Sequence, residues 1–462
     1  MIPTTLTMSS EHHKLLMAHV FPEDGCEAVA IALCGRSHGN STHKILVRDI
    51  ELVPYSSCSI RRPDQVTWST ELLVPLLVKA AKNNWAIVKI HGHRGYRKFS
   101  DVDDFSDKEL FPSIYSWTDS NDPHASIILM DDGTAFGRVI TSEGNFITLE
   151  SVNIIGDDLN FFYANNNGSA LPEFGQRIAQ TFGKGTFNKL RKLKIAVIGC
   201  SGTGSPVIEQ LSRNCVGTLL LVDPDRVEEK NLNRILNTTM ADANAKTFKV
   251  DVAARSIQAM GLGTNVRTHA KTLFDPEVVM DIATCDIVFG CMDSIDGRFL
   301  LNKLASFYLL PYFDLGVKIV ADGNGGVDQV CGSVHYLKPG GSSLLSRNLF
   351  TLEQVRAAGL RRTDPVHYQE QVNQGYIKGV EEDRPAVIQL NFLIASIAVN
   401  ELLARLHPYR IDPNEDYAIT RVSLSHGIFD HENDGLICPI ISRHSGKGDV
   451  LPLLEWAELS KV

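Results

Sequence analysis

The sequence predicts an α/β protein whose later part holds a mostly parallel, nucleotide-binding sheet. Its 462 residues are enough for two or three domains, each with its own core. A glycine-rich turn lies between an apolar strand and a helix, and its glycines are Gly199, Gly202 and Gly204. The next strand ends on Asp223, so the strand, loop, helix and strand follow one another as in a mononucleotide-binding half-sheet.

Composition narrows the class of protein. Hydrophobic residues make up 44% and charged residues 21%, as in ordinary globular proteins. The formal net charge of −9 argues against a nucleic-acid partner, since phosphate-binding surfaces are usually basic. We expect no membrane span and no signal peptide, because no long uncharged apolar run is present and the N-terminal stretch carries His and Glu. Nine scattered cysteines suit a reducing compartment, so we expect a cytoplasmic protein.

The first part of the chain mixes strands and helices. Apolar runs, β-branched residues and turn signals predict an opening helix within 1–21, strands at 27–35, 43–53, 85–93, 125–132 and 135–141, and a helix at 69–83. A stretch rich in Asn, Gly, Ser and Pro at 163–175 is the expected linker.

The second part alternates helix and strand. We expect helices at 174–193, 205–214, 297–309 and 387–406, and strands at 194–199, 218–223, 285–293 and 310–317. The helix at 387–406 is apolar nearly all round, which predicts a buried core helix.

The glycine loop and the residues after it suggest which nucleotide binds. A turn this tight needs residues without a Cβ, and it leaves backbone N–H groups and a helix N-terminus facing a phosphate. Ser201 stands at the third position of the usual G-x-G-x-x-G pattern, so a dinucleotide fingerprint is imperfect. Asp223 can accept hydrogen bonds from ribose hydroxyls. Arg234 is out of place in a nicotinamide site and suits a triphosphate.

Four motifs in order resemble the ThiF/MoeB/ubiquitin-activating enzyme family. They are G-C-S-G-T-G, LVDPDRVEEKNLNR, Lys249 and GCMDSIDGR. The resemblance implies a Rossmann-like adenylation domain that uses ATP and Mg²⁺, and a homodimer in which an arginine reaches the phosphates of the opposite subunit. The resemblance implies that Asp223 binds the ribose, that Asp225 also contacts the nucleotide, and that Asn231, Arg234 and Lys249 contact the phosphates. It implies further that Asp293 binds Mg²⁺ and that Arg298 supports Asp293. Arg177 is the residue that resembles the arginine reaching the opposite subunit.

A second candidate site lies in the first part. His91 and His93 are two apart on a predicted strand, so their side chains point to one face and can share a metal ion. A third ligand from Asp103 leaves a tetrahedral ion one open position for water. Glu27 is the candidate general base for that water.

This H-x-H, then S-x-x-D, with an upstream glutamate resembles the JAB/MPN (JAMM) metallopeptidase domain, an α+β zinc isopeptidase fold. The resemblance implies bound Zn²⁺ and an oxyanion-stabilising Ser100. The gap between His93 and Ser100 is one residue shorter than usual in this family, so Asp104 stays an alternative to Asp103 as ligand. Arg94 stands where many members carry proline. We therefore expect a JAB/MPN domain over 1–165 and a ThiF-type domain over 166–462.

Several thiolates that are usual in this adenylation family are absent. Where relatives carry two CxxC pairs, this chain has Ser343, Ser346 and Cys438, and Ile441 as the fourth residue, so we expect no zinc there. Cys331 and Cys438 are weak candidates for a thioester cysteine, and we expect Cys200 and Cys291 to line the nucleotide pocket.

Together the motifs predict an enzyme that adenylates the C-terminal carboxylate of a ubiquitin-like, β-grasp protein and carries an isopeptidase domain that processes the same tail. The combination resembles proteins of bacterial ubiquitin-like conjugation operons, some of them antiphage, in which a conjugating enzyme is a further partner. The alternative is a sulfur-carrier adenylyltransferase of the thiamine or molybdopterin type. A third hypothesis is a scaffold whose JAB domain only binds the ubiquitin-like partner.

Overall fold

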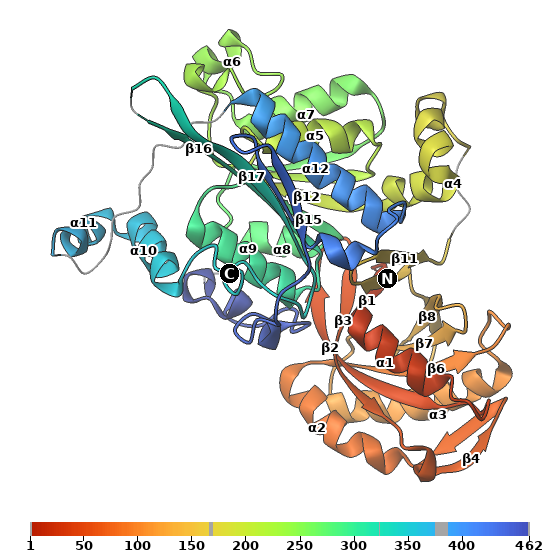
Figure 1. Ribbon diagram of the computed structural model, residues 1–462. Coiled ribbons are helices and arrows are strands. Elements are labelled where there is room, and N and C mark those ends of the chain that lie inside the picture. Colours follow the sequence, from red (N-terminus) through yellow and green to blue (C-terminus); the bar gives the residue numbers. More distant parts are fainter. Residues whose placement is uncertain (1, 166–169, 323, 375–386, 461–462) are drawn as a thin grey trace. The chain divides into compact units, whose positions relative to one another are not determined.

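The computed structural model describes residues 2–165, 170–322, 324–374 and 387–460 (Figure 1). Part of the expected linker, residues 166–169, lies outside that range. The chain divides into two compact units. The N-terminal unit is Met1–Gly168 with two short later segments, Phe307–Leu309 and Ser445–Leu451. The C-terminal unit is Ser169–Ser306, Leu310–His444 and Pro452–Val462.

The N-terminal unit is built on a nine-stranded mixed sheet with the order β11-β10-β1-β3-β2-β6-β7-β8-β9. The strands are β1 (Thr4–Ser9), β2 (Val29–His38), β3 (His43–Leu52), β6 (Ala86–His93), β7 (His124–Met130), β8 (Ala135–Ile140), β9 (Phe146–Thr148), β10 (Ser151–Ile155) and β11 (Leu159–Tyr163). A separate hairpin joins β4 (Cys58–Arg62) and β5 (Gln65–Trp68).

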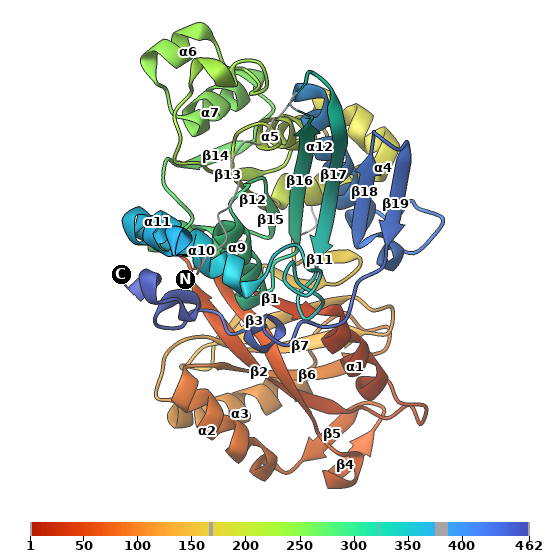
Figure 2. The ribbon, with the colours of Figure 1, turned by 60° about the vertical axis from the view of Figure 1, so that its left-hand side comes forward.

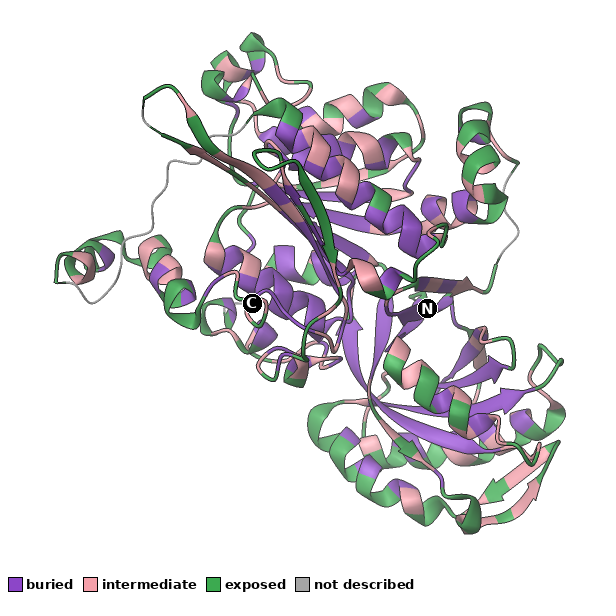
Figure 3. Cartoon of the chain, viewed as in Figure 1, coloured by how far each residue is buried: buried purple, intermediate pink, exposed green. Residues whose placement is uncertain are grey.

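Apolar side chains of alternating strand positions fill a core on each face of this sheet. Helix α1 (Ser10–Val20) contributes Leu16 and Val20 to one core. Helices α2 (Val74–Asn83) and α3 (Asp101–Thr118) cover the other, with Leu77 and Phe111 buried. Figure 3 shows the strands buried along most of their length and the outer faces of the helices exposed.

Several elements of this unit differ from expectation, and strands β1, β4, β5, β9, β10 and β11 were not predicted. The opening segment is a strand before it is a helix, since Ser9 ends β1 and caps α1 by accepting a hydrogen bond from the backbone N–H of His12. Helix α3 was not anticipated. It begins with a capping box in which Ser100 and Asp103 satisfy each other's backbone N–H groups.

The segment Ser445–Leu451 completes the N-terminal unit from the far end of the sequence. Gly448 forms a parallel β-bridge with Arg36, and a Cβ on Gly35 would overlap the carbonyl oxygen of Gly446. The imidazole of His38 lies 3.2 Å from the carboxylate of Asp449. Close backbone approach, which only glycine permits, therefore holds this segment against β2.

The C-terminal unit contains an eight-stranded sheet with the order β14-β13-β12-β15-β16-β17-β18-β19. Its strands are β12 (Lys194–Ile198), β13 (Thr218–Val222), β14 (Asn265–His269), β15 (Ile287–Gly290), β16 (Tyr312–Ala321), β17 (Val327–Leu337), β18 (Ile419–Ser423) and β19 (Ile428–Glu432). Pairing is parallel from β14 to β16 and antiparallel from β16 to β19. Figure 2 shows the antiparallel half. The prediction of a mixed α/β fold with parallel strands is confirmed.

Helices cover both faces of this sheet. Figure 1 shows α5 (Gly204–Arg213), α7 (Lys249–Met260) and α12 (Ile388–Leu406) on one face and α8 (Pro276–Ala283) and α9 (Ile295–Phe307) on the other. Helix α12 is long and apolar enough to span a membrane, but 61% of its apolar window is buried inside the protein, where it packs on α5, β16 and β17. The remaining helices are α4 (Gln176–Lys192), α6 (Met240–Ala245), α10 (Leu352–Thr363) and α11 (Pro365–Asn373).

Candidate nucleotide site and metal cluster

The glycine loop lies at the point where the strand order of the C-terminal sheet reverses. Strand β12 has β13 on one side and β15 on the other, and all three are parallel. The loops at their carboxyl ends therefore open into one crevice, which is where open α/β sheets bind ligands. Asp223 follows β13 and Asp293 follows β15, so the topology brings both acids to the loop that follows β12.

Close backbone packing explains the glycines of this loop. Gly199 has a φ of +93°, and a Cβ there would lie 2.7 Å from the carbonyl oxygen of Cys291. A Cβ on Gly204 would overlap the carbonyl oxygen of Gly199. The loop then runs into the first turn of α5, where Ser205 donates its backbone N–H to the carbonyl oxygen of Ser201 and Pro206 has no N–H, so this turn offers an anion few free donors.

A cavity of about 450 Å³ opens above the loop. Most of the residues predicted for nucleotide binding line it, namely Gly199, Gly202, Asp223, Asp225, Arg234, Lys249 and Asp293. Gly204 contributes by starting α5 rather than by lining the cavity. Sequence motifs that are up to 94 positions apart (293 − 199) thus meet around one space large enough for a nucleotide.

Charge in the cavity centres on Asp223 and Lys249, which are both buried. Burial raises the pKa of Asp223, although Lys249 and the backbone N–H groups of Cys200 and Asp225 oppose that rise. Those two N–H groups donate to the Asp223 carboxylate at 2.7 and 2.9 Å. The Lys249 ammonium lies 2.7 Å from Asp225 and 3.9 Å from Asp223. The Asp223 carboxylate is therefore held in place by the two N–H groups, and the Lys249 ammonium is available to bind an incoming phosphate.

Two residues predicted to contact phosphates are missing from the described lining of this cavity. Asn231 is buried, and its side-chain oxygen accepts a hydrogen bond from the backbone N–H of Glu228 at 3.0 Å, which caps a short turn. Arg177 is exposed on α4 and donates to Gln180 at 3.2 Å. Arg234 lines the cavity and donates to the carbonyl oxygen of Lys230 at 2.6 Å.

Arg298 hydrogen-bonds Asp314, an acid that the sequence did not single out, and the charge of Asp293 also acts on its guanidinium. Its Nε donates to the fully buried Asp314 at 3.0 Å, and the hydroxyl of Tyr312 donates to the same carboxylate at 2.6 Å. Burial alone would raise the pKa of Asp314, but Arg298 lowers it overall. Arg298 also lines the cavity, so this buried pair connects β16 to the cavity wall.

Cys200 and Cys291 are set for packing rather than for attack, whereas Cys331 on β17 is only partly buried. Burial raises the pKa of the Cys200 and Cys291 thiols well above the ordinary value, so both stay neutral. Ser343 and Ser346 hydrogen-bond each other's backbone N–H groups at 2.9 and 3.1 Å. Cys438 is buried nearby, with its N–H on the carbonyl oxygen of Gly341. Residues 375–386 of the cysteine-free stretch lie outside the described part.

Several lining residues carried no signal in the sequence. Lys271 and Phe274 come from the segment after β14, Arg362 from α10 and Asn391 from α12. The guanidinium of Arg362 stacks on the Phe274 ring, 3.4 Å from its centroid, and bonds to Asp296 at 2.8 Å. No spacing rule links these segments to the glycine loop, so only the fold reveals them.

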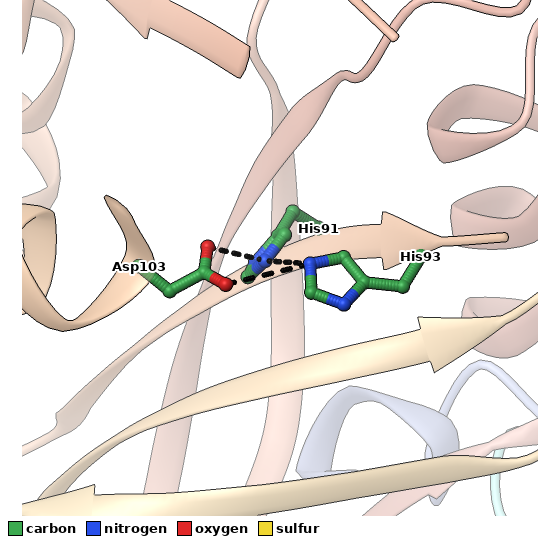
Figure 4. Close-up of side chains that lie close together, drawn as sticks. All are labelled: His91, His93 and Asp103. Atoms are coloured by element: carbon green, nitrogen blue, oxygen red, sulfur yellow. Dashed lines mark hydrogen bonds and ion pairs between the residues drawn. The ribbon is translucent and has the colours of Figure 1, made fainter. Parts of the chain in front are cut away.

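Among the described residues, one group of His and carboxylate side chains is close enough to share a metal ion. It consists of His91, His93 and Asp103, whose candidate ligand atoms all lie within 4.8 Å of one another. Figure 4 shows both imidazole rings turned toward the carboxylate. Nε2 of His91 is 2.9 Å and Nε2 of His93 is 3.4 Å from Asp103, and the two Nε2 atoms are 3.1 Å apart.

These contacts fit a metal ion. The Nδ1 atom of His93 lies 3.1 Å from the carbonyl oxygen of Tyr96, which fixes that nitrogen as the donor and leaves Nε2 with a lone pair toward the cluster. Ser100 donates to Asp103 through both Oγ and backbone N at 2.7 Å, which orients the carboxylate. Two imidazole nitrogens and a carboxylate that converge in this way are the donor set of catalytic zinc.

The neighbouring acids take separate positions. Asp104 forms an ion pair with Arg138 and lies outside the cluster, so the geometry selects Asp103 between the two candidate ligands. Glu27 is half-buried just before β2 and is close enough to feel the charges of His93 and Asp103. Burial raises the pKa of Glu27 to about 7, in the range that suits a general base.

Comparison with known proteins identifies the C-terminal unit. Residues 174–426, more than half of the chain, match the model of the ThiF family. The chain belongs to the ThiF family.

Similar proteins include ubiquitin-like modifier-activating enzyme 5 of Drosophila willistoni, 26% identical over 166 residues, 33% of this chain and 38% of the relative. Adenylyltransferase and sulfurtransferase UBA4 of Meyerozyma guilliermondii is 32% identical over 138 residues, 29% of this chain and 32% of the relative. The chain therefore spans well under half the length of these relatives. The E. coli MccB structure with ATP is 18% identical over 59% of this chain and 74% of its own, with a TM-score of 0.42.

Proposed function

We propose that this chain adenylates the C-terminal carboxylate of a ubiquitin-like protein with ATP and Mg²⁺. The observation that supports this most is the meeting of Asp223, Lys249 and Asp293 around the glycine-loop cavity in a ThiF-family chain. The relatives named ubiquitin-like modifier-activating enzymes favour this substrate class.

The proposed reaction joins two anions. A carboxylate oxygen forms a bond to the α-phosphorus, the bond from that phosphorus to the bridging oxygen breaks, and pyrophosphate leaves with the electron pair. Lys249 and Arg234 offset the repulsion, and the glycine loop offers backbone N–H donors. Asp293 is positioned to hold Mg²⁺, which would neutralise phosphate charge. Fixing both reactants above one loop supplies the orientation.

The test is ATP–pyrophosphate exchange with a purified β-grasp protein encoded beside this chain. We expect exchange above background that Asp293→Ala abolishes. Asp328→Ala is the matched control, because Asp328 is exposed on β17 and lies outside the described cavity lining. The proposal fails if exchange is absent with the wild-type chain or survives Asp293→Ala.

The site is completed, we propose, by Arg177 of a second copy in a homodimer. This proposal accounts for an exposed Arg177 that is absent from the described lining of its own cavity. Mixing inactive Arg177→Ala and Asp293→Ala proteins would then restore activity, because each mixed dimer contains one intact site. No recovery after subunit exchange, which mass photometry of tagged chains can verify, would contradict an arginine in trans.

The His91, His93 and Asp103 cluster supports a second activity, that of a JAB/MPN zinc isopeptidase. When bound there, zinc would supply an activated water. We propose that Glu27 would take that water's proton, and that Ser100, which donates to Asp103, would orient this carboxylate and bond a developing oxyanion. Chelator-sensitive cleavage of a ubiquitin-like precursor or conjugate would support this activity. Binding without cleavage by the zinc-loaded wild-type chain would favour the scaffold hypothesis instead.

A sulfur-carrier adenylyltransferase is the alternative substrate class. The similarity to an adenylyltransferase and sulfurtransferase favours it, as does the absence of cysteine from residue 332 to residue 437. A thiocarboxylate product, seen by mass spectrometry, would select this alternative, whereas amide-linked conjugates would select conjugation. If amide-linked conjugates form, we propose that the chain acts in a bacterial ubiquitin-like conjugation pathway in the cytoplasm. A conjugating enzyme would then receive the activated tail, and the pathway would serve antiphage defence.

A further inference from the structure

Asn391 is a buried amide that lies directly over the glycine loop. It is in the first turns of α12, is 1% exposed and lines the nucleotide cavity. A Cβ on Gly202 would lie only 2.5 Å from its Nδ2 atom. Gly202 has no left-handed φ, so crowding by Asn391 explains why a glycine stands there.

The side-chain amide of Asn391 leaves one buried atom without a partner in the part of the chain that the structure describes. Its Nδ2 atom is buried and has no hydrogen-bond partner within residues 2–165, 170–322, 324–374 and 387–460. A buried donor without a partner costs free energy, and native proteins rarely leave one unexplained. The carboxylate of Glu401, a buried polar residue near the other end of the same helix, does have partners in Arg405 and Arg410.

The surroundings indicate which acceptor is missing. Helix α12 packs along α5, so Asn391 approaches Gly202 in the cavity that Arg234 and Lys249 also line. Donors that converge on a glycine loop suit the oxygens of a phosphate. The N–H of a side-chain amide can orient a phosphate oxygen without adding a charge to the site. A hydrogen bond from this N–H strengthens as negative charge builds on the phosphate.

We propose that Asn391 is a nucleotide-binding residue whose Nδ2–H donates a hydrogen bond to a non-bridging oxygen of the α-phosphate. This inference rests on the proposed adenylation function, because it assumes that the cavity binds an adenine nucleotide. It adds a residue from α12 to the site, far in sequence from the glycine loop, the Asp223 strand end and Lys249.

The test compares AMP with adenosine, which differ only in the phosphate, by calorimetric titration of the full-length chain. In Asn391→Leu, an apolar variant of similar size, we expect AMP affinity to fall about tenfold or more and adenosine affinity to stay within about twofold. Asn400→Leu is the matched control. Asn400 is an exposed asparagine of the same helix that donates to Ser396, and its change should alter neither affinity.

Two further measurements separate this role from a structural one. Asn391→Asp keeps the shape but puts a carboxylate beside the phosphate, so AMP affinity should fall further than in the leucine variant while adenosine binding persists. Without ligand, Asn391→Leu should unfold at a temperature no lower than the wild type, because it removes an unpaired buried donor. AMP should then raise its unfolding temperature less than it raises that of the wild type.

The outcomes distinguish the two proposals. If the wild type binds neither AMP nor ATP, the adenylation function itself fails, and this inference with it. If the wild type binds AMP and both Asn391 variants bind it equally well, or lose AMP and adenosine affinity in parallel, only the role of Asn391 is overturned.

Discussion

The ammonium group of Lys249 lies 2.7 Å from the carboxylate of Asp225. Lys249 is the first residue of α7 and is 7% exposed, so its charge is directed into the cavity rather than to bulk water. A phosphate that enters beside it would exchange one anionic partner for another. The ion pair therefore keeps the lysine in place before ATP binds.

Lys249→Ala should lower the rate of ATP–pyrophosphate exchange by about 100-fold, the usual effect of removing one transition-state donor. Lys249→Arg should retain part of the activity, because it keeps the charge but not the shape. Circular dichroism checks that both variants fold. A Lys249→Ala protein with wild-type exchange would show that this ammonium does not act on the phosphates.

Asp314→Asn should lower the free energy of unfolding by about 3 kcal/mol, because it leaves the Arg298 charge buried without its partner. Urea denaturation gives the value. The matched control is Glu432→Gln, which breaks the exposed pair with Arg421 and should cost less than about 1 kcal/mol. If both variants lowered the free energy of unfolding equally, the buried Arg298–Asp314 pair would not stabilise the fold more than an exposed pair does.

Acid should destabilise the N-terminal unit through His124. This residue is fully buried, its Nδ1 accepts the backbone N–H of Ile87 at 2.9 Å, and burial lowers its pKa from 6.5 to about 3. The unfolded chain therefore binds one more proton between these pH values, so stability is complete above pH 6.5 and decreases as pH falls.

The expected slope from His124 is about 1.4 kcal/mol per pH unit below pH 6. His124→Asn keeps an acceptor but does not titrate, so its unfolding free energy should depend less on pH by this amount, even if it is lower at neutral pH. Urea titrations of both proteins between pH 4 and 7.5 give the difference. Parallel curves would show that His124 does not carry this dependence.

Asp103→Ala and Asp104→Ala should differ in zinc content. Asp103 faces both histidines, whereas Asp104 pairs with Arg138, so only the first change removes a candidate ligand. Elemental analysis after dialysis against zinc should give about one ion per chain for the wild type and Asp104→Ala, and much less for Asp103→Ala. The opposite order would move the ligand to Asp104.

The sequence predicted functional residues best where they belong to one short motif within a single strand, loop or helix. The glycine loop, the acids at two strand ends and the H-x-H strand are short patterns, and the structure places them around one cavity and one cluster. The spacing of His91 and His93 sufficed because side chains two apart on a strand share a face. The choice between Asp103 and Asp104 depended on the phase of α3, which the sequence did not reveal.

What escaped prediction depends on contacts between distant segments. Arg298 was expected to support Asp293, and its pairing with Asp314 on the neighbouring strand β16 was not foreseen, because strand adjacency is a property of the sheet. Strands β17 and β18 were missed, and so was the approach of Asn391 to Gly202, which needs the packing of α12 on α5.

The return of Ser445–Leu451 to β2 also bears on how the protein can be dissected. A fragment that ends near residue 165 would lack the backbone that covers Gly35 and the Asp449 carboxylate that His38 contacts. Such a truncation would expose an unpaired stretch of β2, which invites association between molecules. The N-terminal unit thus depends on residues 445–451 for part of its structure, so any activity of this unit is best measured in the whole chain, with one candidate site inactivated at a time.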